Sequence, residues 1–386
     1  MNLDFTPEQE MIRDTYRRFC EKELTPEYVR WYDENCDYLP QDMYDKFATL
    51  GTQGLTIPEA YGGQGLGMTE FAIVLEEISR KSVAAAFCVG CGLAFGARPL
   101  LDMGSEALKN KHLPRIARGE EKWSLALTEP AGGTDILGAI STTAVRKGDR
   151  YVVNGAKQWI TGAHVADYFT AVVITDPSAP RKKGLSVLVI DAKSPGVTVR
   201  PIQKLGIHGC GTNAVFFDNV EVPVENLLGT EHNGWYELLK TLNPERITTS
   251  VFSLGVAQAA FDYALAYSKD RKAFGRPIGG FQILQHYLAD VAIEIELSRN
   301  LIYRCAWLAD QGRPYHIEVA MAKVAACRAS ELAARHGMEI LGGYGYAMEY
   351  DMQRHFRDYK QMMFSPISDE MARNQIAESF GLPRSF

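Results

Sequence analysis

The chain has 386 residues, a hydrophobic fraction of 46% and a formal net charge of −6 at pH 7. Its length exceeds that of a usual single-core domain, so we expect two or three domains, and its acidic balance argues against nucleic-acid binding, which normally needs a basic surface. No apolar run reaches the length of a membrane span, no signal peptide is recognised, and the odd number of seven cysteines is typical of reduced thiols, so we expect a cytoplasmic protein that binds no membrane.

Residues 1–120 have the pattern of a helical domain. Thr6-Pro7-Glu8-Gln9 supplies an N-cap hydroxyl, a proline at the first helical position and the glutamine of a capping box, so a helix is expected to begin there. Apolar residues at helical spacing predict further helices around residues 43–50 and 71–78. The glycine- and proline-rich stretch between them, residues 51–67, is expected to be a loop.

Residues 121–232 change to short runs of β-branched and aromatic residues separated by turns. Such runs cover residues 151–155, 168–175, 185–190, 197–199 and 214–224. No helical stretch of useful length separates them. We therefore predict an antiparallel β domain and not a unit of parallel strands joined by helices.

Residues 233–386 return to helical periodicity. Long amphipathic stretches cover residues 244–269, 282–311 and 315–341, and their length predicts a four-helix bundle. Because proline is favoured at the first position of a helix, we expect the first of these helices to begin at Pro244. The predicted fold class is α+β, with an N-terminal helical domain, a central β domain and a C-terminal bundle.

Two segments of the central domain carry the strongest chemical signal. Leu127-Thr-Glu-Pro-Ala-Gly-Gly-Thr-Asp135 leaves a short apolar strand and enters a glycine-rich turn, whose N–H groups can point at an anion. Lys157-Gln-Trp-Ile-Thr-Gly162 places an indole ring beside a threonine hydroxyl at the end of another strand. An aromatic plane and a hydroxyl beside an anion-binding turn suit a flat ring with a phosphate tail, and FAD fits that description.

With this order of domains and motifs, the chain resembles the acyl-CoA dehydrogenase flavoproteins over essentially its whole length. The resemblance rests on the segments Gly54–Gly63, Leu127–Asp135, Lys157–Gly162, Arg271–Gly275 with Phe281-Gln282, and Leu341–Gly345. It implies a central antiparallel β-barrel domain between the two helical ones, FAD as the cofactor and an acyl-CoA substrate. It also implies a homotetramer, a dimer of dimers, that passes electrons to an electron-transferring flavoprotein.

The resemblance also implies roles for single residues around the cofactor. Trp159 would cover one face of the flavin ring, and Thr161 would donate a hydrogen bond to the ring nitrogen that receives hydride. The ring edge and the pyrophosphate would be lined by Leu127, Thr128, Gly133 and Thr134. The flavin tail would be contacted by Ser368 and Glu370 and, from a neighbouring subunit, by Arg271, Phe274, Gln282, Glu339 and Gly343. Family members usually have glutamine where this chain has Glu339.

The reaction of this family needs a base for the weakly acidic α-proton of a thioester, and a carboxylate with a pKa raised by desolvation is the expected one. Many members place that glutamate in a Tyr-Glu-Gly-Thr segment near the C-terminus. Alignment from Arg357-Asp358 puts this position on Pro366, which cannot ionise.

A second location for the base exists within the family. Isovaleryl-CoA and long-chain enzymes supply it from a Leu-x-x-Glu-Arg segment, which this chain matches with Leu242-Asn-Pro-Glu-Arg246. The resemblance therefore assigns Glu245 as the catalytic base and Arg246 as a contact to CoA. In the first turn expected for this helix, the macrodipole favours a glutamate for structural reasons and lowers its pKa, which opposes the effect of burial.

The direction of the reaction stays open in the sequence. Ser365-Pro-Ile-Ser-Asp-Glu-Met371 is similar to a segment of crotonobetainyl-CoA reductase, a branch of the family that reduces an enoyl-CoA. An oxidase on the same fold and a non-catalytic subunit that binds flavin or CoA are also compatible with the sequence. Asp369 and Glu370 are fallback carboxylates for the base.

Cys88-Val-Gly-Cys91 has the spacing of a redox pair. It lies in a run of small apolar residues, 84–96, which the resemblance places along the acyl-chain pocket, and no second pair accompanies it. We interpret the two cysteines as packed structural thiols. The eight histidines show no ligand spacing, so no metal site is predicted.

Overall fold

The N-terminal region is helical in the computed structural model, which describes residues 4–384. As predicted, Thr6 and Gln9 form a capping box, with the Thr6 hydroxyl accepting from the Gln9 N–H at 3.2 Å and the Gln9 amide oxygen accepting from the Thr6 N–H at 3.0 Å. The expected helices near residues 43–50 and 71–78 are confirmed as α3 and α4. The region comprises α1 (Pro7–Glu23), α2 (Pro26–Asn35), α3 (Gln41–Thr49), α4 (Met68–Ser79), α5 (Val83–Cys91), α6 (Arg98–Met103) and α7 (Glu106–Ala117).

One apolar helix corrects an expectation from the sequence. α5, a π-helical segment from Gly92 to Ala97, and α6 form a continuous helix, Val83–Met103, which is long and apolar enough to span a membrane. Most of this helix is buried inside the protein. A methyl group on Gly96 would stand only 2.5 Å from Cγ of Trp123, so the helix packs directly on strand β1 (Trp123–Ala126). It is therefore a core helix of the fold.

The central domain is a sheet with the strand order β6-β7-β3-β2-β4-β5-β8, and β1 pairs with β4. Most neighbours are antiparallel, but β4 pairs in parallel with both β1 and β2, so the prediction of a purely antiparallel domain is wrong in this detail. The chain passes from β1 to the parallel strand β4 through the β2–β3 hairpin. The sequence interpretation had considered only helices as the connection between parallel strands. The strands are β1 (Trp123–Ala126), β2 (Thr143–Lys147), β3 (Arg150–Thr161), β4 (Tyr168–Ile174), β5 (Leu185–Asp191), β6 (Val197–Ile202), β7 (Thr212–Pro223) and β8 (Leu227–Leu228), with the short helix α8 (Ile136–Ala139) after β1.

The C-terminal region is built on three long helices, α9 (Gly234–Asp270), α10 (Gln282–Asp310) and α11 (His316–Leu341). The ends predicted for α10 and α11 agree within one residue, but α9 begins well before Pro244. Proline removes one helical hydrogen bond, yet α9 continues through it because its length is packed against α4, α10 and α11. The remaining elements are the β9–β10 hairpin (Lys272–Ala273 and Arg276–Pro277), α12 (Gly343–Tyr346), α13 (Met352–Met362) and α14 (Asp369–Ser379).

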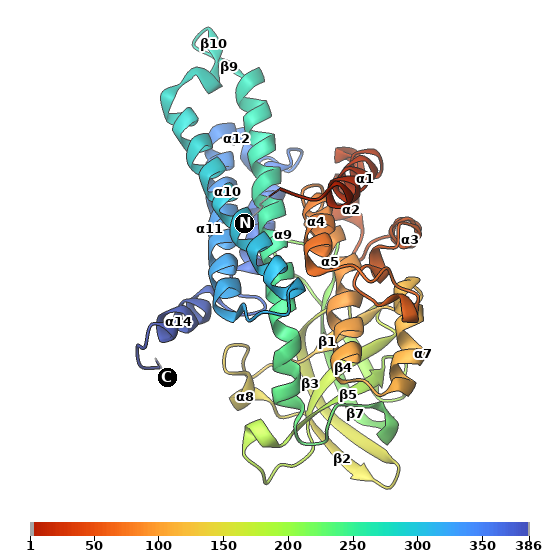
Figure 1. Cartoon of the computed structure of the whole chain (residues 1–386). Coiled ribbons are helices and arrows are strands. Elements are labelled where there is room, and N and C mark those ends of the chain that lie inside the picture. The colour runs from red at the N-terminus through yellow and green to blue at the C-terminus, as the bar shows by residue number, and fades with distance from the viewer. Residues whose placement is uncertain (1–3, 385–386) are drawn as a thin grey trace.

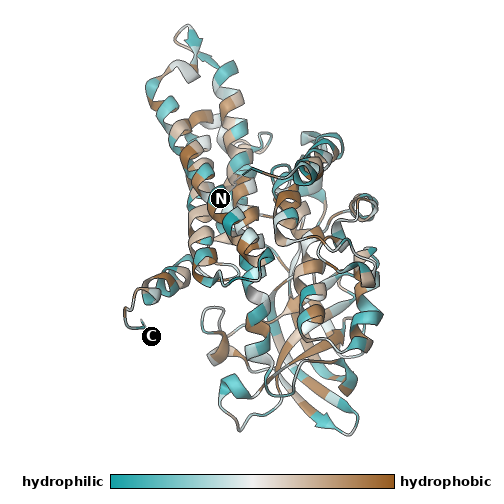
Figure 2. Ribbon diagram, in the orientation of Figure 1, coloured by the Kyte–Doolittle hydropathy of each residue, from teal (hydrophilic) through white to brown (hydrophobic). Residues whose placement is uncertain are grey.

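Helix α9 runs the height of the molecule, from the β domain to the β9–β10 hairpin, with the N-terminal helices beside it (Figure 1). Hydrophobic residues follow the long helices and the interior of the β domain, whereas the hairpin is hydrophilic (Figure 2). Alternate residues of β4 and β5 belong to two different hydrophobic cores. Val172 and Val187 belong to the core shared with the helices, and Val173 and Leu188 belong to the core inside the β domain.

Candidate active site

A buried ion pair stabilises the glycine-rich turn after β1. Nζ of Lys157, fully buried on β3, lies 2.8 Å from a carboxylate oxygen of Glu129 and donates to the carbonyls of Leu127 at 3.2 Å and Val172 at 2.6 Å. Glu129 also accepts from the N–H and hydroxyl of Ser141 at 2.8 and 2.6 Å. Burial lowers the pKa of Lys157 to about 8. Burial acts to raise the pKa of Glu129, but Lys157 and the surrounding donors lower it overall, so the pair is ionised near neutral pH.

Trp159 is turned outward by a bulge in β3. The pairing of β3 with β7 shifts register between Lys157 and Ile160, and Trp159 there has a φ of 64°, in the left-handed region that few aromatic residues adopt. Its indole is 57% exposed, whereas Lys157 and Ile160 point into the protein. A bulge re-aims a side chain in this way, and an exposed aromatic plane at this position fits a flat cofactor ring.

The turn itself offers donors to an anion. Gly133 and Thr134 are exposed, and within residues 4–384 their N–H groups make no hydrogen bond to the protein. Thr161 ends β3 nearby in the same sheet, where its carbonyl accepts from the Ser124 hydroxyl at 2.7 Å. Free N–H groups beside an outward-facing indole and a threonine are the donor set that a flavin with a pyrophosphate needs, so the residues present fit the cofactor.

A second group of predicted cofactor residues lies together at the C-terminal end of α9. Arg271, Glu339 and Gly343 line one cavity of about 570 Å³, where the guanidinium of Arg271 lies 5.5 Å from the ring centroid of Tyr344. Because α9 has 37 residues, it is about 55 Å long. The short helix α8, which directly follows the glycine-rich turn, lies beside the β domain, whereas this cavity lies at the C-terminal end of α9, so the two groups stand well apart in one chain (Figure 1).

The remaining predicted cofactor residues lie outside this cavity. Phe274 is 94% exposed at the turn of the β9–β10 hairpin, and Gln282 is the first residue of α10. Ser368 caps α14 by accepting from the N–H of Met371 at 3.2 Å, and hydrogen bonds from the helix backbone and Ser368 lower the pKa of Glu370. Their roles toward a cofactor stay predictions.

Glu245 lies in the interior of α9 and not in its first turn. The dipole argument made for a helix starting at Pro244 therefore does not apply. Burial raises the pKa of Glu245 to about 7, although part of the residue is accessible to solvent, and the charge of Arg246 acts in the opposite direction. No hydrogen bond to its carboxylate is formed within the described chain. Arg246 is also half-buried and donates to the side chain of Gln375 on α14 at 3.2 Å.

Sequence reasoning assigned no role to the Glu129–Lys157 pair, although both residues belong to the motifs it used. A signal was available, because each charged residue lies beside an apolar strand segment, and charges in such surroundings are normally paired. Cys88 and Cys91 are both buried free thiols, as expected for packed structural cysteines. Burial raises the pKa of Cys88 well above that of an ordinary thiol, which makes it unreactive.

Three family models match the chain in the order of its regions. The acyl-CoA dehydrogenase N-terminal domain matches residues 6–120, the middle domain residues 124–220 and the C-terminal domain residues 232–381. The chain is 37% identical to the probable acyl-CoA dehydrogenase YngJ of Bacillus subtilis (strain 168) over 98% of this chain and 99% of that protein. It is 38% identical to the caffeyl-CoA reductase-Etf complex subunit CarC of Acetobacterium woodii over 92% of this chain and 93% of that one.

The solved structures agree with this result. The structure of a glutaryl-coenzyme A dehydrogenase in complex with glutaryl-CoA matches with a TM-score of 0.95 and 36% identity, covering 100% of this chain and 98% of that one. The matches extend over all three regions and include both the sheet and the long helices. The chain therefore belongs to the acyl-CoA dehydrogenase family of oxidoreductases.

Proposed function

We propose that the protein forms an α,β-double bond in an acyl-CoA thioester, with Glu245 as the base that removes the α-proton. The observation that carries the proposal is the environment of Glu245, a carboxylate without a hydrogen-bond partner in the described chain and with a pKa raised by burial to about 7. A base with this pKa is half deprotonated near neutral pH and can take a proton from a weak carbon acid. Pro366 occupies the alternative position and cannot serve.

The cofactor in this proposal is FAD, which supplies the hydride-accepting chemistry when bound. The turn at Gly133 and Thr134 would hold its pyrophosphate, Trp159 would cover the ring, and Thr161 would donate to it. Leu127 and Thr128 lie at the start of the same turn, fixed by the buried Lys157. Arg246 would bind CoA from its half-buried position on α9.

Glu245→Gln tests the assignment of the base. The purified holoenzyme is mixed anaerobically with a panel of acyl-CoA thioesters, and loss of flavin absorbance is followed. The variant should retain FAD but bleach at least about a thousandfold more slowly with the thioester that the wild type oxidises. Asp262→Asn, which removes an exposed carboxylate on the same helix, should bleach like the wild type. Bleaching of Glu245→Gln at the wild-type rate would contradict the assignment.

The reverse reaction, reduction of an enoyl-CoA, is the second candidate. It is favoured by the similarity to the caffeyl-CoA reductase subunit and by Pro366, since that position lacks the glutamate of many dehydrogenases. Anaerobic turnover of enoyl-CoA thioesters with a reduced flavoprotein as the electron donor would distinguish it from a dehydrogenase. An oxidase would instead produce hydrogen peroxide in air without an added acceptor.

The assembly and partners are also proposals. We infer a homotetramer, because Arg271, Glu339 and Gly343 lie at the C-terminal end of α9, away from the turn at Gly133 and Thr134 beside the β domain (Figure 1), and would serve the cofactor of a neighbouring subunit. Electrons would pass to an electron-transferring flavoprotein, which the name of the caffeyl-CoA reductase relative supports. All seven cysteines are free thiols, which supports a cytoplasmic location.

A further inference from the structure

The loop between β6 and β7, residues 203–211, is the direct neighbour of the strand end that carries Thr161. The Gly162 N–H donates to the carbonyl of Gly211 at 2.8 Å, and Thr161 pairs with Thr212 at the start of β7. The Asn213 amide donates to the carbonyl of Ile160 at 3.1 Å. Any displacement of this loop therefore moves the backbone on which Thr161 stands.

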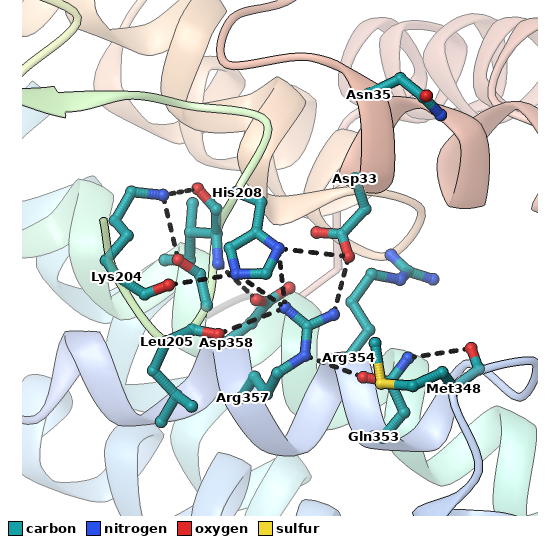
Figure 3. Close-up of polar contacts among 12 residues, drawn as sticks. Asp33, Asn35, Lys204, Leu205, His208, Met348, Gln353, Arg354, Arg357 and Asp358 are labelled. Atoms are coloured by element: carbon teal, nitrogen blue, oxygen red, sulfur yellow. Dashed lines mark hydrogen bonds and ion pairs between the residues drawn. The ribbon is translucent and has the colours of Figure 1, made fainter. Parts of the chain in front are cut away.

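Arg357 joins this loop to two other parts of the fold (Figure 3). From α13 its guanidinium donates to Asp33 of α2 at 2.7 Å, to the carbonyl of Leu205 at 3.3 Å and to a ring nitrogen of His208 at 3.2 Å. The side chains of Arg357 and Asp33 are 12% and 11% exposed, so this ion pair is well shielded from solvent. The loop is therefore clamped between an N-terminal and a C-terminal helix.

Asp358, the next residue of α13, fixes the centre of the same loop. Its buried carboxylate accepts from the N–H of Ile207 at 2.6 Å. Ile207 has a φ of 53°, a conformation that a β-branched residue adopts only when its surroundings impose it. A methyl group on Gly206 would stand 2.5 Å from the carbonyl oxygen of Arg357, so the loop lies directly on the helix.

We propose that Asp358 and Arg357 are positioning residues for flavin reduction: by clamping loop 203–211 they set where Thr161 stands against the flavin ring. This inference rests on the proposed function only in assigning the flavin to Trp159 and Thr161. Arg357 and Asp358 contact the loop and not Thr161 itself, so in this proposal they act on the hydrogen bond to the ring only through the loop. A hydrogen bond to a flavin ring nitrogen alters the electronics of the ring, so the clamp influences the reduction potential.

Asp358→Ala and Arg357→Lys in the FAD-loaded enzyme test the clamp from its two sides. The first leaves the Ile207 N–H without an acceptor, and the second cannot reach Asp33 and Leu205 together. Both should shift the visible flavin spectrum and the midpoint potential, and slow flavin reduction about tenfold while KM changes little. Asp358→Asn keeps an acceptor oxygen and should restore the spectrum and potential of the wild type.

The matched control is Arg30→Lys. Arg30 also joins α2 to the start of α13, through Asp351 at its N-cap position at 3.0 Å, but makes no ion pair or hydrogen bond to the loop within the described residues. It should leave the spectrum and potential unchanged; an equal shift in this variant, or no shift in Asp358→Ala and Arg357→Lys, would overturn the proposal. If Asp358→Ala does not fold, the spectrum and midpoint potential of Arg357→Lys alone test the proposal. Failure of the wild type to bind FAD would instead refute the proposed function, because the spectrum and potential need no substrate.

Discussion

At the scale of single residues, the proposed chemistry depends on the protonation of Glu245. Its pKa is raised by burial to about 7, and Arg246 only partly offsets this effect. Because a base must be ionised to accept a proton, flavin bleaching by substrate should be slow below this pH and approach a plateau above it, with a midpoint of about 7. Stopped-flow bleaching across the pH range measures it, and a rate independent of pH would argue for another base.

The same shift predicts an effect on stability. The pKa of Glu245 rises from an ordinary value of 4.5 to about 7 in the folded state, so the unfolded state releases its proton first as pH increases. Folding is therefore penalised progressively between these two values and fully above the second, by about 3 kcal/mol. Glu245→Gln should be more stable than the wild type to urea at pH 8, with the difference lost at pH 4.5. A difference that persists in acid would point to packing instead.

At the scale of elements, the ion pair of Glu129 and Lys157 ties the turn after β1 to β3 and β4. Lys157→Met leaves the Glu129 carboxylate buried without its cation, and should lower the free energy of unfolding by about 3–5 kcal/mol and weaken FAD retention. Lys193→Met, which removes an exposed lysine that pairs with Asp167 at 2.9 Å, should cost less than about 1 kcal/mol. Urea titrations of both variants make the comparison, and equal losses would contradict the assigned role of the buried pair.

The sequence predicted those elements correctly whose formation depends on neighbouring residues. The capping box at Thr6 and the ends of α10 and α11 depend on neighbouring residues and were predicted correctly. The start of α9 was wrong because packing of the whole helix overrides the local preference of Pro244. The parallel pairing of β1 with β4, and the convergence of Asp33 and Arg357 on one loop, join residues far apart in the chain, and no short-range pattern encodes them.

At the scale of the whole molecule, the turn at Gly133 and Thr134 lies beside the β domain, whereas the 570 Å³ cavity lies at the C-terminal end of α9 (Figure 1). In the proposed assembly each flavin therefore touches two chains, one that supplies the turn and one that supplies the cavity. Phe274 fits this arrangement, because it is 94% exposed with a φ of 51° at the turn of the β9–β10 hairpin. A large aromatic residue held outward in this conformation is expected to be covered by a partner.

Phe274→Ser should therefore weaken FAD binding without unfolding the chain. Loss of a buried phenylalanine contact costs about 1.5–3 kcal/mol, or at least about tenfold in affinity. Flavin content after gel filtration, with mass from light scattering, measures cofactor retention and assembly together. Met11→Ser is the matched control, since Met11 is 63% exposed on α1 and should have no effect. Equal flavin retention by both variants would mean that the hairpin does not reach a neighbouring cofactor, and the 570 Å³ cavity would then need another ligand.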